Sequence, residues 1–186
     1  MKVLTKILKR WIPLAVTLTL ICGIVYITVQ QDYRLSANDP QTQMVVDAVN
    51  SLNKGIDPKS LVTGPQLDLA LSLSPYLMIY DASGNPIASG VLLNGNLPYL
   101  PFGVLAYVRQ KGEDVISWQP QDGIRQALVI RKTNGNNLYF VAAGRSLKKT
   151  EERIALLGKQ IIVGWIFSLG VLLVVSLGFS FPQSKL

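Results

Sequence analysis

The chain lacks histidine altogether and has one cysteine, Cys22. Without histidine it is missing the commonest general base and the commonest metal ligand. A single cysteine can form neither an internal disulfide nor a zinc-binding thiolate cluster. Cys22 also lies in an apolar run, where a thiol is typically a packing residue. We therefore expect neither a metal site nor a cofactor.

Charge is absent from two long apolar stretches, residues 11–29 and 161–181. At about 1.5 Å of rise per residue, each helix would approach the roughly 30 Å thickness of a bilayer core. We predict two transmembrane helices with these bounds, preceded by a basic tail (1–10) and followed by a short tail (182–186). In the second helix, Gly164 and Ser168 form a small-residue pair that permits close helix packing.

The placement of positive charge predicts the orientation in the bilayer. Four cations precede the first run: Lys2, Lys6, Lys9 and Arg10. Cations before the second run argue for the opposite orientation, but the first helix usually dominates. We predict cytoplasmic termini and an extracytoplasmic domain over residues 30–160. That domain holds 13 basic and 11 acidic residues, a balance that argues against nucleic-acid binding.

Between the two apolar runs, helix and strand patterns alternate. The expected elements are a helix from N-cap Asp39 to Gly55, a weaker helix over 57–75 broken near Gly64-Pro65, strands 76–80 and 87–93 around a turn, a helix from Pro101 to Gly112, strands 114–120, 123–132 and 138–144, and a helix from about Ser146 that runs into the second span. A strand pair, a crossover helix and a three-strand meander predict an α+β fold with a five-stranded antiparallel sheet.

Two stretches carry a family resemblance. "IYDASGNPIASG" (79–90) resembles the hairpin between the first two strands of PAS-like extracytoplasmic sensor domains, called Cache or PDC domains. "VAAGRSLKKTEERI" (141–154) is similar to their last strand and exit helix. The resemblance covers residues 32–160 and extends to the N-terminal half of bacterial sensor histidine kinases. It implies a PAS-like sheet, a bacterial cytoplasmic membrane, and a small polar or carboxylate ligand.

The departure from those kinases shapes the expected function. Only residues 182–186 follow the second span, with no phosphoacceptor histidine and no nucleotide-binding domain. We therefore expect a sensor-like protein that signals laterally to a membrane-embedded kinase or another partner, and a homodimer is compatible with this. Two alternatives stay open: a scaffold whose PAS-like domain binds another protein, and the remnant of a sensor kinase.

The resemblance implies a ligand between the sheet and its covering elements. Candidate ligand-binding residues are Tyr107, Arg109, Trp118 and Arg125, because arginine can pair with a carboxylate and an aromatic ring can wall a pocket. Alternatively, Trp118 is core and the arginines lie on a solvated face. Arg145 and Ser146 are candidates for relaying a signal to the exit helix, with a solvated side chain and a helix N-cap as the alternatives.

Signals for catalysis are weak. Ser146 and Lys149 match the S-x-x-K pattern of serine acyl-transfer enzymes, but the accompanying motifs are missing. The acidic pairs at 113–114 and 151–152 are adjacent in sequence, so the two members of each pair point in different directions. We therefore do not expect an enzyme.

Overall fold

The computed structural model describes residues 2–178, so residues 179–181 of the second predicted span and the tail 182–186 lie outside the described range. The chain divides into two compact units. One comprises the chain up to Tyr33 together with the chain from Glu152 onward, and the other comprises Arg34–Glu151.

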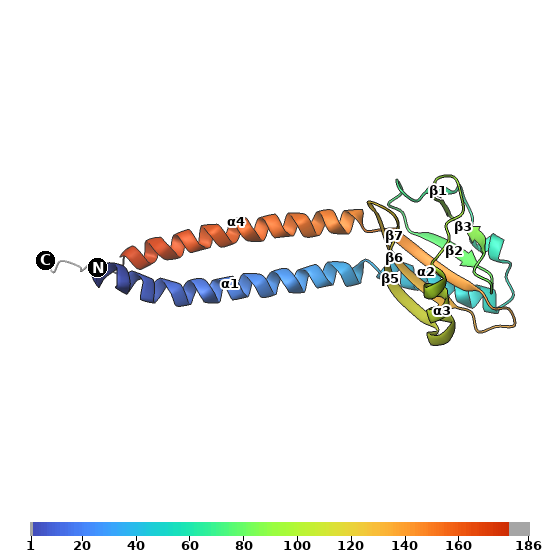
Figure 1. Cartoon of the computed structure of the whole chain (residues 1–186), viewed down its shortest axis with the longest axis horizontal. Coiled ribbons are helices and arrows are strands. Elements are labelled where there is room, and N and C mark those ends of the chain that lie inside the picture. The colour runs from blue at the N-terminus through green and yellow to red at the C-terminus, as the bar shows by residue number, and fades with distance from the viewer. Residues whose placement is uncertain (1, 179–186) are drawn as a thin grey trace. The chain divides into compact units, whose positions relative to one another are not determined.

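The first unit is a pair of long apolar helices. Helix α1 runs over Lys2–Ser36 and helix α4 over Lys148–Gly178, antiparallel and side by side (Figure 1). Both are long and apolar enough to cross a membrane. Side chains turned inward recur on α1 every three or four residues, at Trp11, Ala15 and Leu18, as expected for a helix packed along one face.

The predicted small-residue pair of α4 does not pack against α1. A Cβ atom at Gly164 would meet nothing within 4 Å. The Ser168 hydroxyl donates to the Gly164 carbonyl of its own helix at 2.8 Å. Close approach occurs instead at Gly158, where an added Cβ would lie 3.5 Å from the Tyr26 ring of α1.

The second unit is built on a five-stranded antiparallel sheet, which confirms the predicted α+β class. Its strands are β2 (Tyr76–Tyr80), β3 (Pro86–Ser89), β5 (Glu113–Gln121), β6 (Ile124–Lys132) and β7 (Phe140–Ser146), in the order β3-β2-β7-β6-β5. The last strand of this sheet, β7, therefore pairs with its first strand, β2, and β3 and β5 form the two edges.

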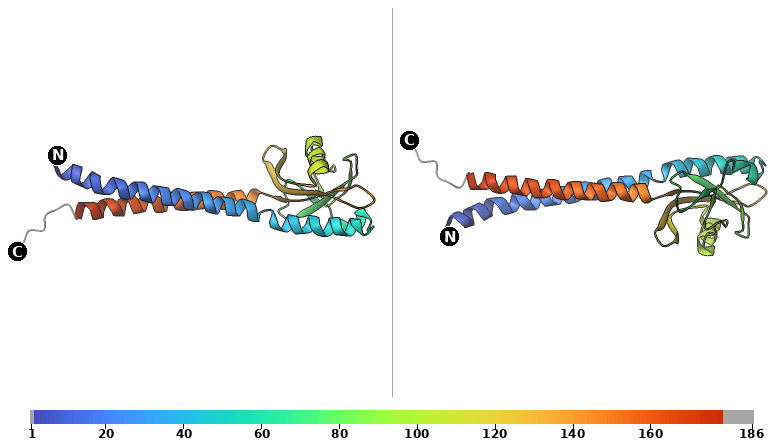
Figure 2. Two further views of the ribbon diagram at one scale, coloured as in Figure 1. Left: turned by 90° about the horizontal axis from the view of Figure 1, so that it is seen from below. Right: turned by 90° about the horizontal axis from the view of Figure 1, so that it is seen from above.

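Helices cover the two faces of this sheet, as Figure 2 shows. Helix α2 (Asp39–Asn53) packs Val45, Val49 and Leu52, which recur at helical spacing, against one face. Helix α3 (Phe102–Lys111) and a small parallel pair, β1 (Leu67–Asp68) with β4 (Val91–Leu92), cover the other. Large buried side chains, among them Tyr80 and Phe140, fill the layer between the sheet and α3.

The prediction of a second helix over residues 57–75 is wrong. This segment holds a single 3-10 turn, Pro58–Leu61, followed by β1. The Asp57 carboxylate accepts from the Lys59 backbone N–H at 3.1 Å and caps that turn. Gly64 has a φ of +105°, and prolines at 65 and 75 remove backbone donors, so a continuous helix cannot form.

Several boundaries differ from the prediction by a few residues. The N-cap of α2 is Asn38 rather than Asp39, which is the first helical residue. The predicted strand 87–93 is divided at Gly90 into β3 and β4. Strand β5 continues past Pro120, which is tolerated because β5 is an edge strand. Helix α4 begins at Lys148, two residues after Ser146.

Candidate functional site

The β2–β3 hairpin is held by its own aspartate. The Asp81 carboxylate accepts from the backbone N–H groups of Ser83 and Asn85, both at 2.8 Å, and from the Asn85 side-chain amide at 3.1 Å. These bonds, the Asn85 N–H foremost, hold the pKa of Asp81 below its usual value. Gly84 has a φ of +87°. A Cβ there would lie 2.9 Å from Leu105 of α3, so the turn seats against that helix.

Two of the predicted ligand-binding residues lie on α3. Arg109 donates to the Ala82 carbonyl of the hairpin turn, and its guanidinium lies 5.5 Å from the centre of the Phe140 ring. A cation over an aromatic face is attracted by the ring quadrupole. Arg109 therefore ties α3 to the hairpin and the sheet. Tyr107 is about half exposed on the same helix.

Trp118 belongs to the core. Its side chain is 6% exposed and packs in the cluster between the sheet and α3, together with Leu105, Val108 and Leu128. This position matches the alternative in which Trp118 is a packing residue.

The remaining candidates gather where the sheet leads into α4. The Arg125 guanidinium pairs with Glu151 in the first turn of α4 at 2.6 Å, and the Leu147 N–H donates to the Arg125 carbonyl at 2.9 Å. The Ser146 hydroxyl accepts from the Lys148 N–H at 3.3 Å. Arg145 donates to the carbonyl of Leu73 at 3.4 Å. The start of α4 is thus fastened to both β6 and β7.

The structure does not bring the four ligand-binding candidates together in one recess. Arg109 and Tyr107 are on α3, Trp118 is in the core, and Arg125 is on β6, paired with Glu151 of α4. None of them lines a polar recess of about 390 Å³ in the second unit, nor two further recesses of about 600 and 420 Å³ in the same unit.

That polar recess lies beside the C-terminal end of α2, at the edge of the sheet. Its polar lining residues are Asn50, Asn53, Lys111, Glu113, Arg131, Lys132 and Asn134. Glu113 and Arg131 are cross-strand partners on β5 and β6, and the Arg131 Nε donates to the Glu113 carboxylate at 3.0 Å. The side-chain amide oxygen (Oδ1) of Asn53 accepts from the Asn134 backbone N–H at 3.2 Å and joins α2 to the β6–β7 turn.

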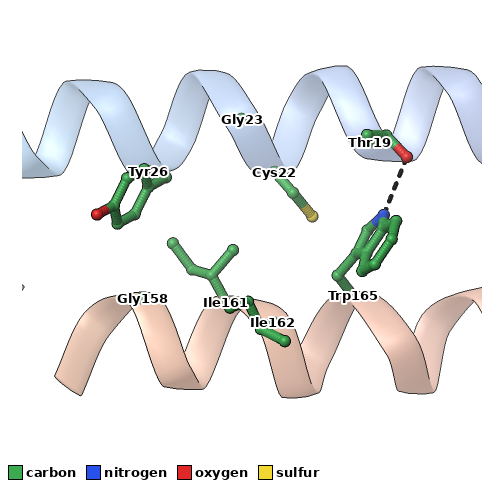
Figure 3. Close-up of a pocket in the computed structure, with 8 residues that line it drawn as sticks. All are labelled: Thr19, Cys22, Gly23, Tyr26, Gly158, Ile161, Ile162 and Trp165. Atoms are coloured by element: carbon green, nitrogen blue, oxygen red, sulfur yellow. Dashed lines mark hydrogen bonds between the residues drawn. The ribbon is translucent and has the colours of Figure 1, made fainter. Parts of the chain in front are cut away.

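Another recess, of about 400 Å³, lies between the apolar helices α1 and α4 (Figure 3). Tyr26 and Trp165 stand at its two ends, and the Cys22 side chain points toward α4. The Trp165 indole donates to the Thr19 hydroxyl at 2.9 Å, and the Trp11 indole donates to the Leu169 carbonyl at 3.3 Å. Each of the two helices therefore contributes one tryptophan that donates a hydrogen bond to the opposite helix.

Sequence reasoning did not identify the polar recess. One signal was available: Glu113 and Arg131 carry opposite charges near the outer ends of two consecutive predicted strands. A hairpin places such residues opposite one another. The contributions of Asn50 and Asn53 had no comparable signal, because the docking of α2 depends on the folded sheet.

Comparison with known protein families and with curated proteins finds no match.

Proposed function

We propose that this chain is a membrane-anchored sensor. In this proposal α1 and α4 cross the bilayer, and residues 34–151 form an extracytoplasmic ligand-binding domain that signals laterally to a partner membrane protein. The α+β architecture, with its strand pair, crossover helix and closing meander, supports the resemblance to PAS-like sensor domains.

One observation carries the proposal. Helix α4 is continuous from Lys148 to Gly178, and its first turn is fastened to the sheet through Arg125, Glu151 and Leu147. A change in the position of β6 or β7 would therefore act on the helix that we assign to the membrane. A ligand can drive such a change only through its differential affinity for two states.

Thermal unfolding of the full chain in lipid nanodiscs, measured against a panel of small metabolites, tests this function. Binding stabilises the folded state by about RT ln(1 + [L]/Kd), roughly 2.7 kcal/mol at a hundredfold excess over Kd. We expect a saturable increase in Tm with one chemical class. A chain that unfolds at the same temperature with every compound would contradict the sensor proposal.

Exposed aromatic side chains favour a second function, a scaffold that binds another protein. Tyr99, just before α3, and Phe102, its first residue, are 65% and 80% exposed, and aromatic residues are enriched in protein interfaces. A photo-crosslinking residue at position 102 would then capture one discrete partner in cells. The same residue at the exposed Lys59 position is the control. Equal labelling at both positions would argue against the scaffold.

A further inference from the structure

The polar recess exists because α2 does not cover the whole sheet. Helix α2 packs over β2, β6 and β7. On the same face, the β5 residues Glu113, Val115 and Ser117 remain exposed. Glu113, the first residue of this edge strand, therefore lies open in the recess beside the C-terminal end of α2, with its cross-strand partner Arg131 next to it on β6.

Positive charge dominates this recess. Lys111, Arg131 and Lys132 line it, against the single carboxylate of Glu113. Arg131 donates through both Nε and Nη2 to the same oxygen of Glu113, so other guanidinium N–H groups remain as donors. Lys132 donates to the Arg109 carbonyl at 2.8 Å with one of its three N–H groups. The Lys111 ammonium group makes no hydrogen bond or ion pair with another described residue.

Amide donors complete the lining. The side-chain amide oxygen of Asn53 is occupied by the Asn134 backbone N–H, and its NH₂ group remains to donate. Asn50 lies three residues earlier on α2, on the same side of the helix, and is exposed. Asn50 and Asn53 therefore add neutral donors to the charged ones.

We propose that this recess binds a small dicarboxylate. The lining carries two more positive than negative charges, which two carboxylates would neutralise, and charge-assisted bonds from Arg131 and Lys111 would hold them. The volume of about 390 Å³ suits a small metabolite. The inference deepens the proposed function and rests on it, because it names the ligand class and moves the site away from Tyr107, Arg109, Trp118 and Arg125.

Calorimetric titration of the full chain in nanodiscs with succinate tests this site, with sodium chloride at equal ionic strength as the blank. We expect saturable binding, and acetate should bind more weakly. Arg131→Ala and Lys111→Ala should each weaken succinate binding at least about tenfold, because each removes a charged donor. The control is Lys59→Ala, an exposed cation outside the recess, which should bind like the wild type.

A further variant guards against loss of folding. Asn50→Leu changes an exposed residue of α2 and places an apolar side chain in the recess, so it should fold normally and bind succinate poorly. Wild-type levels of binding in the Arg131, Lys111 and Asn50 variants would overturn the site, as would a wild-type chain that ignores succinate. If other metabolites then stabilise the chain, the sensor function stands and only this site is rejected. If nothing stabilises it, the sensor function is rejected too.

Discussion

Replacing Gly144 with alanine should strongly destabilise the sheet. Gly144 on β7 is the cross-strand partner of Tyr76 on β2, and the Tyr76 ring lies directly across it. An added Cβ would lie 2.7 Å from Cε2 of that ring, closer than any real contact of this kind. Tyr76 is 4% exposed and its hydroxyl donates to Gln126 at 3.4 Å, so the ring has no solvent space to move into.

The cost of this substitution has two parts. Overpacking a well-filled core costs about 1–3 kcal/mol. Leaving the buried Tyr76 hydroxyl without its partner costs about 1–3 kcal/mol more. We expect a total loss of about 2–6 kcal/mol.

Hydrogen exchange of the full chain in nanodiscs, followed on peptides from β2, β6 and β7, measures this loss directly. A cost of 2 kcal/mol corresponds to exchange about thirtyfold faster. The matched control is Gly103→Ala on α3, where an added Cβ meets nothing within 4 Å and helix propensity improves. A Gly144→Ala variant within about 0.5 kcal/mol of the wild type would refute the packing argument. The argument would also be refuted if Gly144→Ala cost as much stability in a Tyr76→Ala background as in the wild type.

Three further predictions concern single contacts. Trp165→Phe should weaken the α1–α4 pair by about 0.6 kcal/mol, measured by SDS titration of an interhelical fluorescence signal; an equal loss in a Thr19→Val background would contradict the hydrogen bond. Asp81 has a depressed pKa, so its stabilisation is present above about pH 4 and is lost as pH falls through the folded-state pKa. Asp81→Asn should therefore flatten the acid side of a Tm–pH profile, and an unchanged profile would refute this. Arg125 and Glu151 are each about half exposed, so their ion pair should contribute little to stability. A double-mutant cycle, measured by hydrogen exchange in the first turn of α4, should give a coupling energy below about 1 kcal/mol. A coupling energy above about 2 kcal/mol would count against this account.

The sheet was predictable from sequence because its signals are local. Tyr76–Tyr80 is apolar with a strong turn after it, and the structure places β2 at those residues. Val45, Val49 and Leu52 recur at helical spacing in the sequence, and they lie on the buried side of α2. The segment 57–75 misled because isolated apolar residues imitate helical spacing, while its prolines and the φ of Gly64 decide against a helix.

The site was less predictable, because its residues come together only through tertiary packing. Trp118 and Arg109 have side chains typical of ligand-binding sites. Packing nevertheless places Trp118 in the core, and Arg109 fastens α3 to the hairpin turn. The recess instead brings Asn50 of α2 next to Arg131 of β6, far apart in the chain. Sequence spacing carries no record of that docking.

Site-directed labelling tests the central claim, a sensor domain displayed outside a membrane that the chain crosses twice. In a Cys22→Ala background, single cysteines replace Lys59 in the domain and Thr5 near the N-terminus. A membrane-impermeant maleimide is then added to intact cells. The account predicts labelling of the Lys59→Cys variant in intact cells and of the Thr5→Cys variant only after lysis. Protection of position 59 until lysis would contradict it.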